Sequence, residues 1–215
     1  IWAPSRIPVP KSSAMITWTS KPLAALGIVT MLGACDAAGT GSALLAGLAP
    51  PTDAALPIVP LRQALMMRGK VTLVPPSGYC IDPESLSENF ALMARCDALG
   101  APTGGSGAPV GVLSVSFTRG GKGTPVPTAQ EITTASRLGQ PQSISRHGQS
   151  VVFKTTGKPP APDLSPYHWR SISRVGGYTM GAALYGPQDR RAVSDEGADL
   201  LREMIQRTTG KTKAG

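Results

Sequence analysis

The chain has 215 residues, enough for one domain of ordinary size, and 41% of them are apolar, which excludes disorder throughout. Its 25 Gly and 21 Pro predict long loops and tethers around a modest core. The formal charge of +8 suits an anionic surface such as lipid headgroups, but no Lys/Arg block has interleaved aromatic residues, so we expect no nucleic-acid partner.

The first 34 residues are typical of an export signal. Residues 22–32 (PLAALGIVTML) are uncharged and apolar. They are too few for a membrane-spanning helix, which needs about 20 residues, but they suit the apolar region of a signal peptide. Lys21 supplies the preceding positive charge, and Met15 is a natural start. We therefore interpret residues 1–34 as an upstream extension followed by a signal peptide.

A cysteine ends this apolar run. Leu32-Gly33-Ala34-Cys35 (LGAC) resembles the lipobox of bacterial lipoprotein precursors, in which the signal peptide is cut just before the cysteine. The resemblance implies that the Cys35 thiol receives a diacylglycerol and that the protein is anchored to a membrane of the cell envelope, facing the periplasm. Asp36 resembles an inner-membrane retention signal of enteric bacteria, but that rule varies between lineages, so inner and outer membrane both stay open. The alternative is a plain secretory signal with an incidental cysteine.

Composition divides the rest of the chain. Residues 35–61 contain mainly small residues and Pro without a persistent helical or strand period, so we expect the lipidated cysteine to be followed by a flexible tether. We expect residues 62–209 to form a single α+β domain and residues 210–215 to form a basic tail.

Two cysteines remain once Cys35 is lipidated. An oxidising envelope favours a disulfide between Cys80 and Cys96, which at this spacing stabilises the fold by about 3 kcal/mol. The alternative, Cys80 as a nucleophile with His147 or His168, lacks a basic residue beside the cysteine. Two cysteines and scattered histidines do not supply the four ligands of a metal site, so we expect no metal and no other cofactor.

The secondary structure is predicted from hydrophobic period, capping residues and turn residues. In chain order we expect a strand over 70–74, a helix over 84–99, a strand over 110–118, a short helix over 128–139, a strand over 149–156, two strands within 167–185 joined at Gly176-Gly177, and a helix over 194–208. This order predicts an α+β fold, with an antiparallel or mixed sheet of about five strands and two or three helices packed on it.

The helix over 84–99 depends on Leu86, Phe90, Met93 and Cys96, which recur at helical spacing. If this helix packs on the preceding strand, Cys96 comes close to Cys80.

The stretch VTLVPPSGYCID with the helix expected after it, the late hairpin and the terminal helix together resemble the Mog1/PsbP-like α/β sandwich over residues 68–208. The chain also resembles small alphaproteobacterial lipoproteins of unassigned function. The likeness bears on the fold and implies no catalytic residues.

The segment YHWRSISR is the most suggestive polar and aromatic stretch. Strand alternation puts Tyr167 and Trp169 on one face and His168, Arg170 and Arg174 on the other. One interpretation is a partner surface that presents Tyr167, His168, Arg170 and Arg174 to an anionic ligand or protein. The alternative, which we favour, is a half-buried strand with Trp169 in the core and the two arginines solvated.

Two functions remain open. The first is a lipid-anchored envelope protein that serves as a non-catalytic binding or accessory module, its partners being the membrane and an envelope protein. The second is a membrane-anchored envelope enzyme, a hydrolase that uses His168 or His147.

We expect the intact mass of the membrane-extracted protein to start at Cys35, to include acyl chains, and to increase by about two mass units on reduction. An unprocessed N-terminus with free thiols would contradict the lipoprotein hypothesis. It would place the protein inside the cell and make Cys80 a candidate reactive thiol.

Overall fold

The structure is a computed structural model that describes residues 59–102, 107–120 and 123–212. The predicted extension and signal peptide (1–34), Cys35, nearly all of the predicted tether (35–61) and the end of the predicted tail (210–215) lie outside the described residues. The elements in chain order are β1 (Ala64–Met66), β2 (Val71–Leu73), β3 (Tyr79–Ile81), η3 (Pro83–Ser85), β4 (Phe90–Arg95), β5 (Val112–Arg119), α1 (Ala129–Ala135), β6 (Gln142–His147), β7 (Ser150–Thr156), β8 (Tyr167–Val175), β9 (Tyr178–Tyr185), η4 (Arg191–Val193) and α2 (Asp195–Lys211).

One large sheet organises these elements. Seven strands follow the order β3-β4-β5-β9-β8-β7-β6, and each neighbouring pair is antiparallel. Strands β1 and β2 form a separate antiparallel ribbon. The α+β class is confirmed, and the sheet has more strands than the five or so expected.

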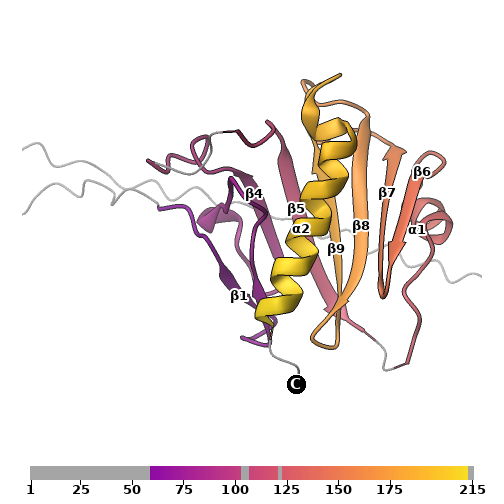
Figure 1. The fold of residues 1–215 in the computed structure, drawn as a ribbon, viewed down its shortest axis with the longest axis horizontal. Helices are drawn as coiled ribbons and strands as arrows, with labels where there is room; N and C mark the ends of the chain where they lie inside the picture. Colours follow the sequence, from indigo (N-terminus) through magenta and orange to yellow (C-terminus); the bar gives the residue numbers. More distant parts are fainter. Residues whose placement is uncertain (1–58, 103–106, 121–122, 213–215) are drawn as a thin grey trace, which may run out of the picture. The chain divides into compact units, whose positions relative to one another are not determined.

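Helix α2 lies across one face of the sheet (Figure 1). Alternate residues of the central strands are buried beneath it, so that Leu113 pairs with Leu184 and Phe117 pairs with Met180 across β5 and β9. The helix contributes a buried stripe that comprises Ala198, Leu200, Leu201, Met204, Ile205 and Thr208. The opposite face has a smaller cluster, where α1 packs on Val151 and Phe153 of β7.

Both ends of α2 are held in place by hydrogen bonds. At the N-terminal end, the indole Nε1 of Trp169 donates to the carbonyl oxygen of Ser194 at 2.7 Å. Gly197 lets the first turn of α2 pack closely against Ala192, because a Cβ at this position would lie 2.1 Å from the Ala192 oxygen. Near the C-terminal end, the Thr208 hydroxyl accepts from Val74 N at 3.1 Å and donates to Val74 O at 3.3 Å. These contacts join the helix to the sheet and to the end of the β1–β2 ribbon.

The expected strands over 70–74, 110–118 and 149–156 are confirmed as β2, β5 and β7, and the expected helices over 128–139 and 194–208 as α1 and α2. The hairpin of β8 and β9 turns at Gly176 and Gly177, whose φ angles of 53° and 81° lie in the left-handed region that glycine adopts readily. The structure adds strands β1 and β3, which have three residues each, the largely exposed strand β6, and strand β4.

The predicted helix over 84–99 is wrong. The segment forms the short turn η3 and then strand β4, in which Ala91 and Met93 point into the core while Phe90 is exposed on the other face. The Ser85 hydroxyl accepts from Leu92 N at 2.8 Å, which holds the turn against the strand. The residues of β4 favour a helix locally, and pairing with β3 and β5 overrides that preference.

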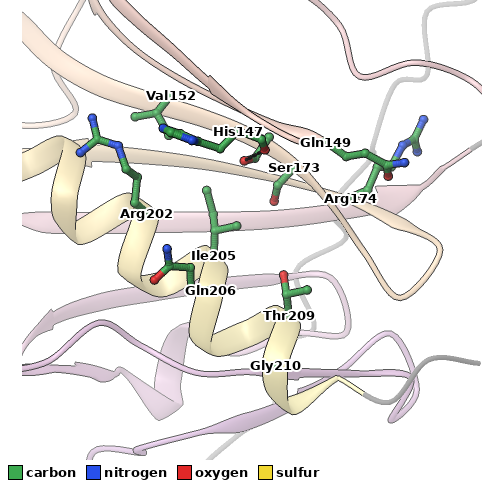
Figure 2. A pocket seen from close by; sticks show the side chains of 11 residues that line it. His147, Gln149, Val152, Ser173, Arg174, Arg202, Ile205, Gln206, Thr209 and Gly210 are labelled. Atoms are coloured by element: carbon green, nitrogen blue, oxygen red, sulfur yellow. Dashed lines mark hydrogen bonds between the residues drawn. The ribbon is translucent and has the colours of Figure 1, made fainter.

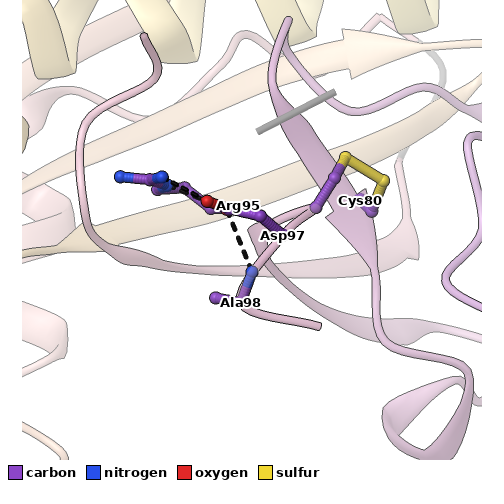
Figure 3. Close-up of a disulfide and its surroundings, with 5 residues drawn as sticks. Cys80, Arg95, Asp97 and Ala98 are labelled. Carbon is purple, nitrogen blue, oxygen red and sulfur yellow. Dashed lines mark hydrogen bonds and ion pairs between the residues drawn. A yellow bond between two sulfur atoms is a disulfide. The ribbon is translucent and has the colours of Figure 1, made fainter. Parts of the chain in front are cut away.

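The predicted disulfide between Cys80 and Cys96 is confirmed (Figure 3). Cys80 lies in β3 and Cys96 directly follows β4, and both residues are fully buried. The bridge therefore joins strand β3 to its neighbour β4 in the sheet, rather than a strand to a helix. Beside it, the Arg95 side chain pairs with Asp97 on the surface, with Nε 3.0 Å from Oδ1.

Among the described residues, no helix is both long and apolar enough to cross a membrane.

Replacing both bridge cysteines with alanine is expected to lower the free energy of unfolding by about 3 kcal/mol, because the unfolded chain loses the constraint of a closed loop. Urea unfolding of the variant and of the reduced wild-type protein should give the same decrease. A change below about 1 kcal/mol in both would mean that the bridge adds little to this hairpin.

Candidate functional site

A groove of about 730 Å³ runs along one flank of α2, and we call it the α2 groove. Figure 2 shows the side chains that line it from the helix and from the ends of the facing strands. The lining includes His147 at the end of β6, Gln149 of the β6–β7 turn, Val152 and Ser173 of the sheet, and Arg202, Ile205, Gln206 and Thr209 of α2.

The periods of helix and strand bring these residues together. Arg202, Gln206 and Thr209 recur at helical spacing on one flank of α2. Ser173 occupies an α2-facing position of β8, two residues from Val175, which is part of the core. His147 ends β6, and its carbonyl oxygen accepts from the Ser150 hydroxyl at 2.7 Å, which closes the β6–β7 turn at the groove.

Two buried polar atoms of the groove have no hydrogen-bond partner. Within the described ranges, three buried side-chain nitrogen or oxygen atoms are unpaired: Ser171 Oγ, Ser173 Oγ and Arg202 Nε. Ser173 is only 1% exposed, and its hydroxyl points from the sheet toward the helix in Figure 2. An unpaired buried polar group costs about 1–3 kcal/mol, so a polar ligand that paired with either atom would remove that cost.

The groove combines positive charge with an apolar floor. The guanidinium of Arg202 forms an ion pair with Asp199 through Nη1 only, and Nε stays unpaired. Val152 and Ile205 form apolar surface beside it. None of the described residues that line the groove is acidic. Anionic groups are therefore favoured at the Arg202 end of this surface.

Of the four residues interpreted as a partner surface, His168 is fully buried. Its ring stacks on Tyr185 with centroids 4.5 Å apart, and Nδ1 donates to the Pro166 oxygen at 3.0 Å. Nε2 accepts from Arg170 Nε at 3.2 Å, which makes the imidazole neutral. Burial lowers the pKa of His168. Both ring nitrogens are occupied by structural contacts.

The two arginines of this segment also have structural partners. Arg170 bonds Tyr185 as well as His168, and is half-buried. Arg174 donates to Thr179 Oγ1 at 2.6 Å and to Thr124 O at 2.7 Å, and its guanidinium extends away from α2 in Figure 2. Tyr167 is 42% exposed. Trp169 lies in the core, as the favoured alternative expected, but the arginines are partly buried rather than simply solvated.

The α2 groove was only partly visible in the sequence. His147, the other candidate histidine, is exposed and lines the groove. Sequence reasoning missed Ser173 and Arg202. Two signals pointed to them: serines at core-facing positions of β8, and polar residues at helical spacing beside the apolar stripe of α2. The described part of the chain has no group of three or more His, Cys, Asp or Glu that could hold a metal ion.

No protein-family model matches the chain, and no curated protein sequence matches it. Among solved structures, the chain is similar to the solution structure of cyanobacterial PsbP (CyanoP) from Synechocystis sp. PCC 6803. The sequence identity is 10% and the TM-score is 0.36, over 74% of this chain and 94% of that one. No function or residue role is transferred from this neighbour.

Replacing Ser173 with alanine is expected to raise the free energy of unfolding by about 1 kcal/mol, because it removes a buried hydroxyl without a partner. Ser165 provides the matched control. It is equally buried, but its hydroxyl donates to Gln188 and accepts from Tyr167 N, so Ser165→Ala should lower stability by about 1 kcal/mol. A destabilised Ser173→Ala protein in urea unfolding would show that this hydroxyl is paired in solution.

Proposed function

We propose that the protein is a lipid-anchored binding module of the bacterial cell envelope, tethered through Cys35 on the periplasmic side, with the α2 groove as its binding site. The observation that carries the proposal is the groove itself, which sets two unpaired buried polar atoms, Ser173 Oγ and Arg202 Nε, beside the apolar surface of Val152 and Ile205. Pockets that bind small molecules are typically apolar with a few polar groups that orient the ligand.

Two features support the envelope location. The LGAC lipobox predicts acylation at Cys35, and the Cys80–Cys96 disulfide is of a kind that persists in oxidising compartments and is rare in the cytosol. The tether over residues 35–61 would then separate the folded domain from the membrane surface.

The arrangement of the histidines favours binding over catalysis. A general base needs a ring nitrogen within reach of substrate, but His168 is fully buried and both of its nitrogens are engaged. His147 does reach the groove. The hydrolase alternative therefore depends on His147, and the experiment below separates the two functions.

The test is native mass spectrometry of the protein extracted from the envelope. We expect the wild-type protein to retain a small ligand, and Gln206→Trp to lose it, because Gln206 is exposed on α2 and a larger side chain there fills the groove. Lys211→Trp adds the same ring to the same helix outside the groove and should keep the ligand.

A His147→Ala variant distinguishes binding from turnover. A binding module should carry the same ligand mass with or without His147. An enzyme that uses His147 should accumulate a different mass in the variant, because substrate is no longer converted. Retention of the ligand by Gln206→Trp would contradict the assignment of the groove.

A further inference from the structure

We infer that the ligand of the α2 groove is a small amphiphile with a single carboxylate head, held by Arg202, and a short apolar chain over Val152 and Ile205. This inference rests on the groove being the binding site, as proposed above, and adds the chemical class of what it binds.

The size of the groove limits the ligand. Its volume of about 730 Å³ lies within the range of pockets that enclose small molecules, roughly 300–1,000 Å³. One side is helix α2 and the other is formed by the ends of β6, β7 and β8. An elongated small molecule lying along the helix fits this shape.

Arg202 determines the charge of the head group. Asp199 occupies Nη1 of its guanidinium, which leaves the edge formed by Nε and Nη2. That edge presents two parallel N–H donors, the geometry that binds a carboxylate through both oxygens. Nε is buried and has no partner in the protein, so a carboxylate placed there would pair a donor that otherwise pays the cost of desolvation.

Ser173 offers a separate donor on the sheet side, further along the groove. In Figure 2 its hydroxyl faces the helix beside Ile205, nearer the C-terminal end of α2 than the guanidinium of Arg202, so Arg202 alone forms the head-group site. The side chain of Arg202 extends from α2 toward the sheet where Val152 and His147 lie. With no acidic residue among the described lining, a cationic ligand would find no counter-charge in the groove.

The apolar part of the lining provides the contact surface for the apolar chain of the ligand. Val152 and Ile205 are largely buried, yet both contribute surface to the groove. The carbon atoms of the polar side chains around them add further apolar surface to the lining. Because apolar contact contributes in proportion to the area removed from water, a ligand with only a charged head would leave most of this surface unused.

The experiment measures binding by titration calorimetry on the full processed chain in nanodiscs, with empty nanodiscs as the blank. The probes are octanoate, octanol and octylamine, which share one chain length and differ in the charge of the head. We expect saturable binding of octanoate, binding of octanol weaker by at least about tenfold, and no binding of octylamine. Equal binding of octanoate and octanol, or no binding of octanoate, would overturn the inference.

Variants of α2 then test the head-group site. Arg202→Met keeps the apolar part of the side chain and removes the guanidinium. The affinity for octanoate should therefore fall about tenfold, while the affinity for octanol is unchanged. Asp199→Asn removes the carboxylate that competes for Arg202 and should strengthen octanoate binding several-fold. Arg207→Met is the control, since Arg207 lies on the same helix outside the groove and pairs with Glu203 and Ser77.

If Arg202→Met does not fold, Asp199→Asn still decides, because an unchanged octanoate affinity in that variant would contradict the role of Arg202.

Octyl phosphate distinguishes a carboxylate head from a phosphate head. Tighter binding of octyl phosphate than of octanoate would overturn the carboxylate assignment. If octanoate does not bind but Gln206→Trp still loses its native ligand, the α2 groove remains the binding site and only the inferred ligand class is wrong. If Gln206→Trp also keeps that ligand, the proposed function fails as well.

Discussion

The position of α2 is the constraint on which the rest of this domain depends. The larger of the two apolar clusters among the described residues lies between the central strands of the sheet, this helix and the β1–β2 ribbon. Hydrogen bonds hold the helix at both ends, from Trp169 to Ser194 and between Thr208 and the backbone of Val74. Because Thr208 is fully buried, its hydroxyl must be paired there, and pairing with Val74 satisfies both the side chain and the end of the ribbon.

This placement makes the two flanks of α2 unequal. One flank faces the loop after β2, where the Glu203 carboxylate accepts from the hydroxyl and the backbone amide of Ser77. The other flank stands beside the ends of β6 to β8 and leaves the larger α2 groove, whereas the pocket at Ser77 and Glu203 has a volume of about 370 Å³. Residues of the two flanks differ by single positions along the helix, as Glu203 and Arg202 illustrate.

Polar groups in this domain separate into two kinds. His168, Arg170 and Arg174 look functional in sequence, but each has partners that tie β8 to neighbouring strands and loops. Ser173 and Arg202 look ordinary, yet each has a buried atom without a partner. Since buried polar groups in folded proteins are nearly always paired, the second kind is the better indicator of a binding site.

The sequence by itself determined the elements whose signals are local. The period and capping residues of α2, the alternation of β5 and the two glycines of the β8–β9 turn each specify one structure within a few residues. The disulfide could also be predicted, because the number of cysteines left after the lipobox allows only one pair.

Only the tertiary structure decided the rest. Phe90 to Arg95 suit a helix, and they form a strand because β3 and β5 offer backbone partners on both sides. The α2 groove joins residues of β6, β8 and α2 that are distant in the chain, and whether Ser173 Oγ or His168 finds a partner depends on what packs against it. Local sequence does not predict whether such an atom is paired, because the pairing depends on contacts between segments rather than within them.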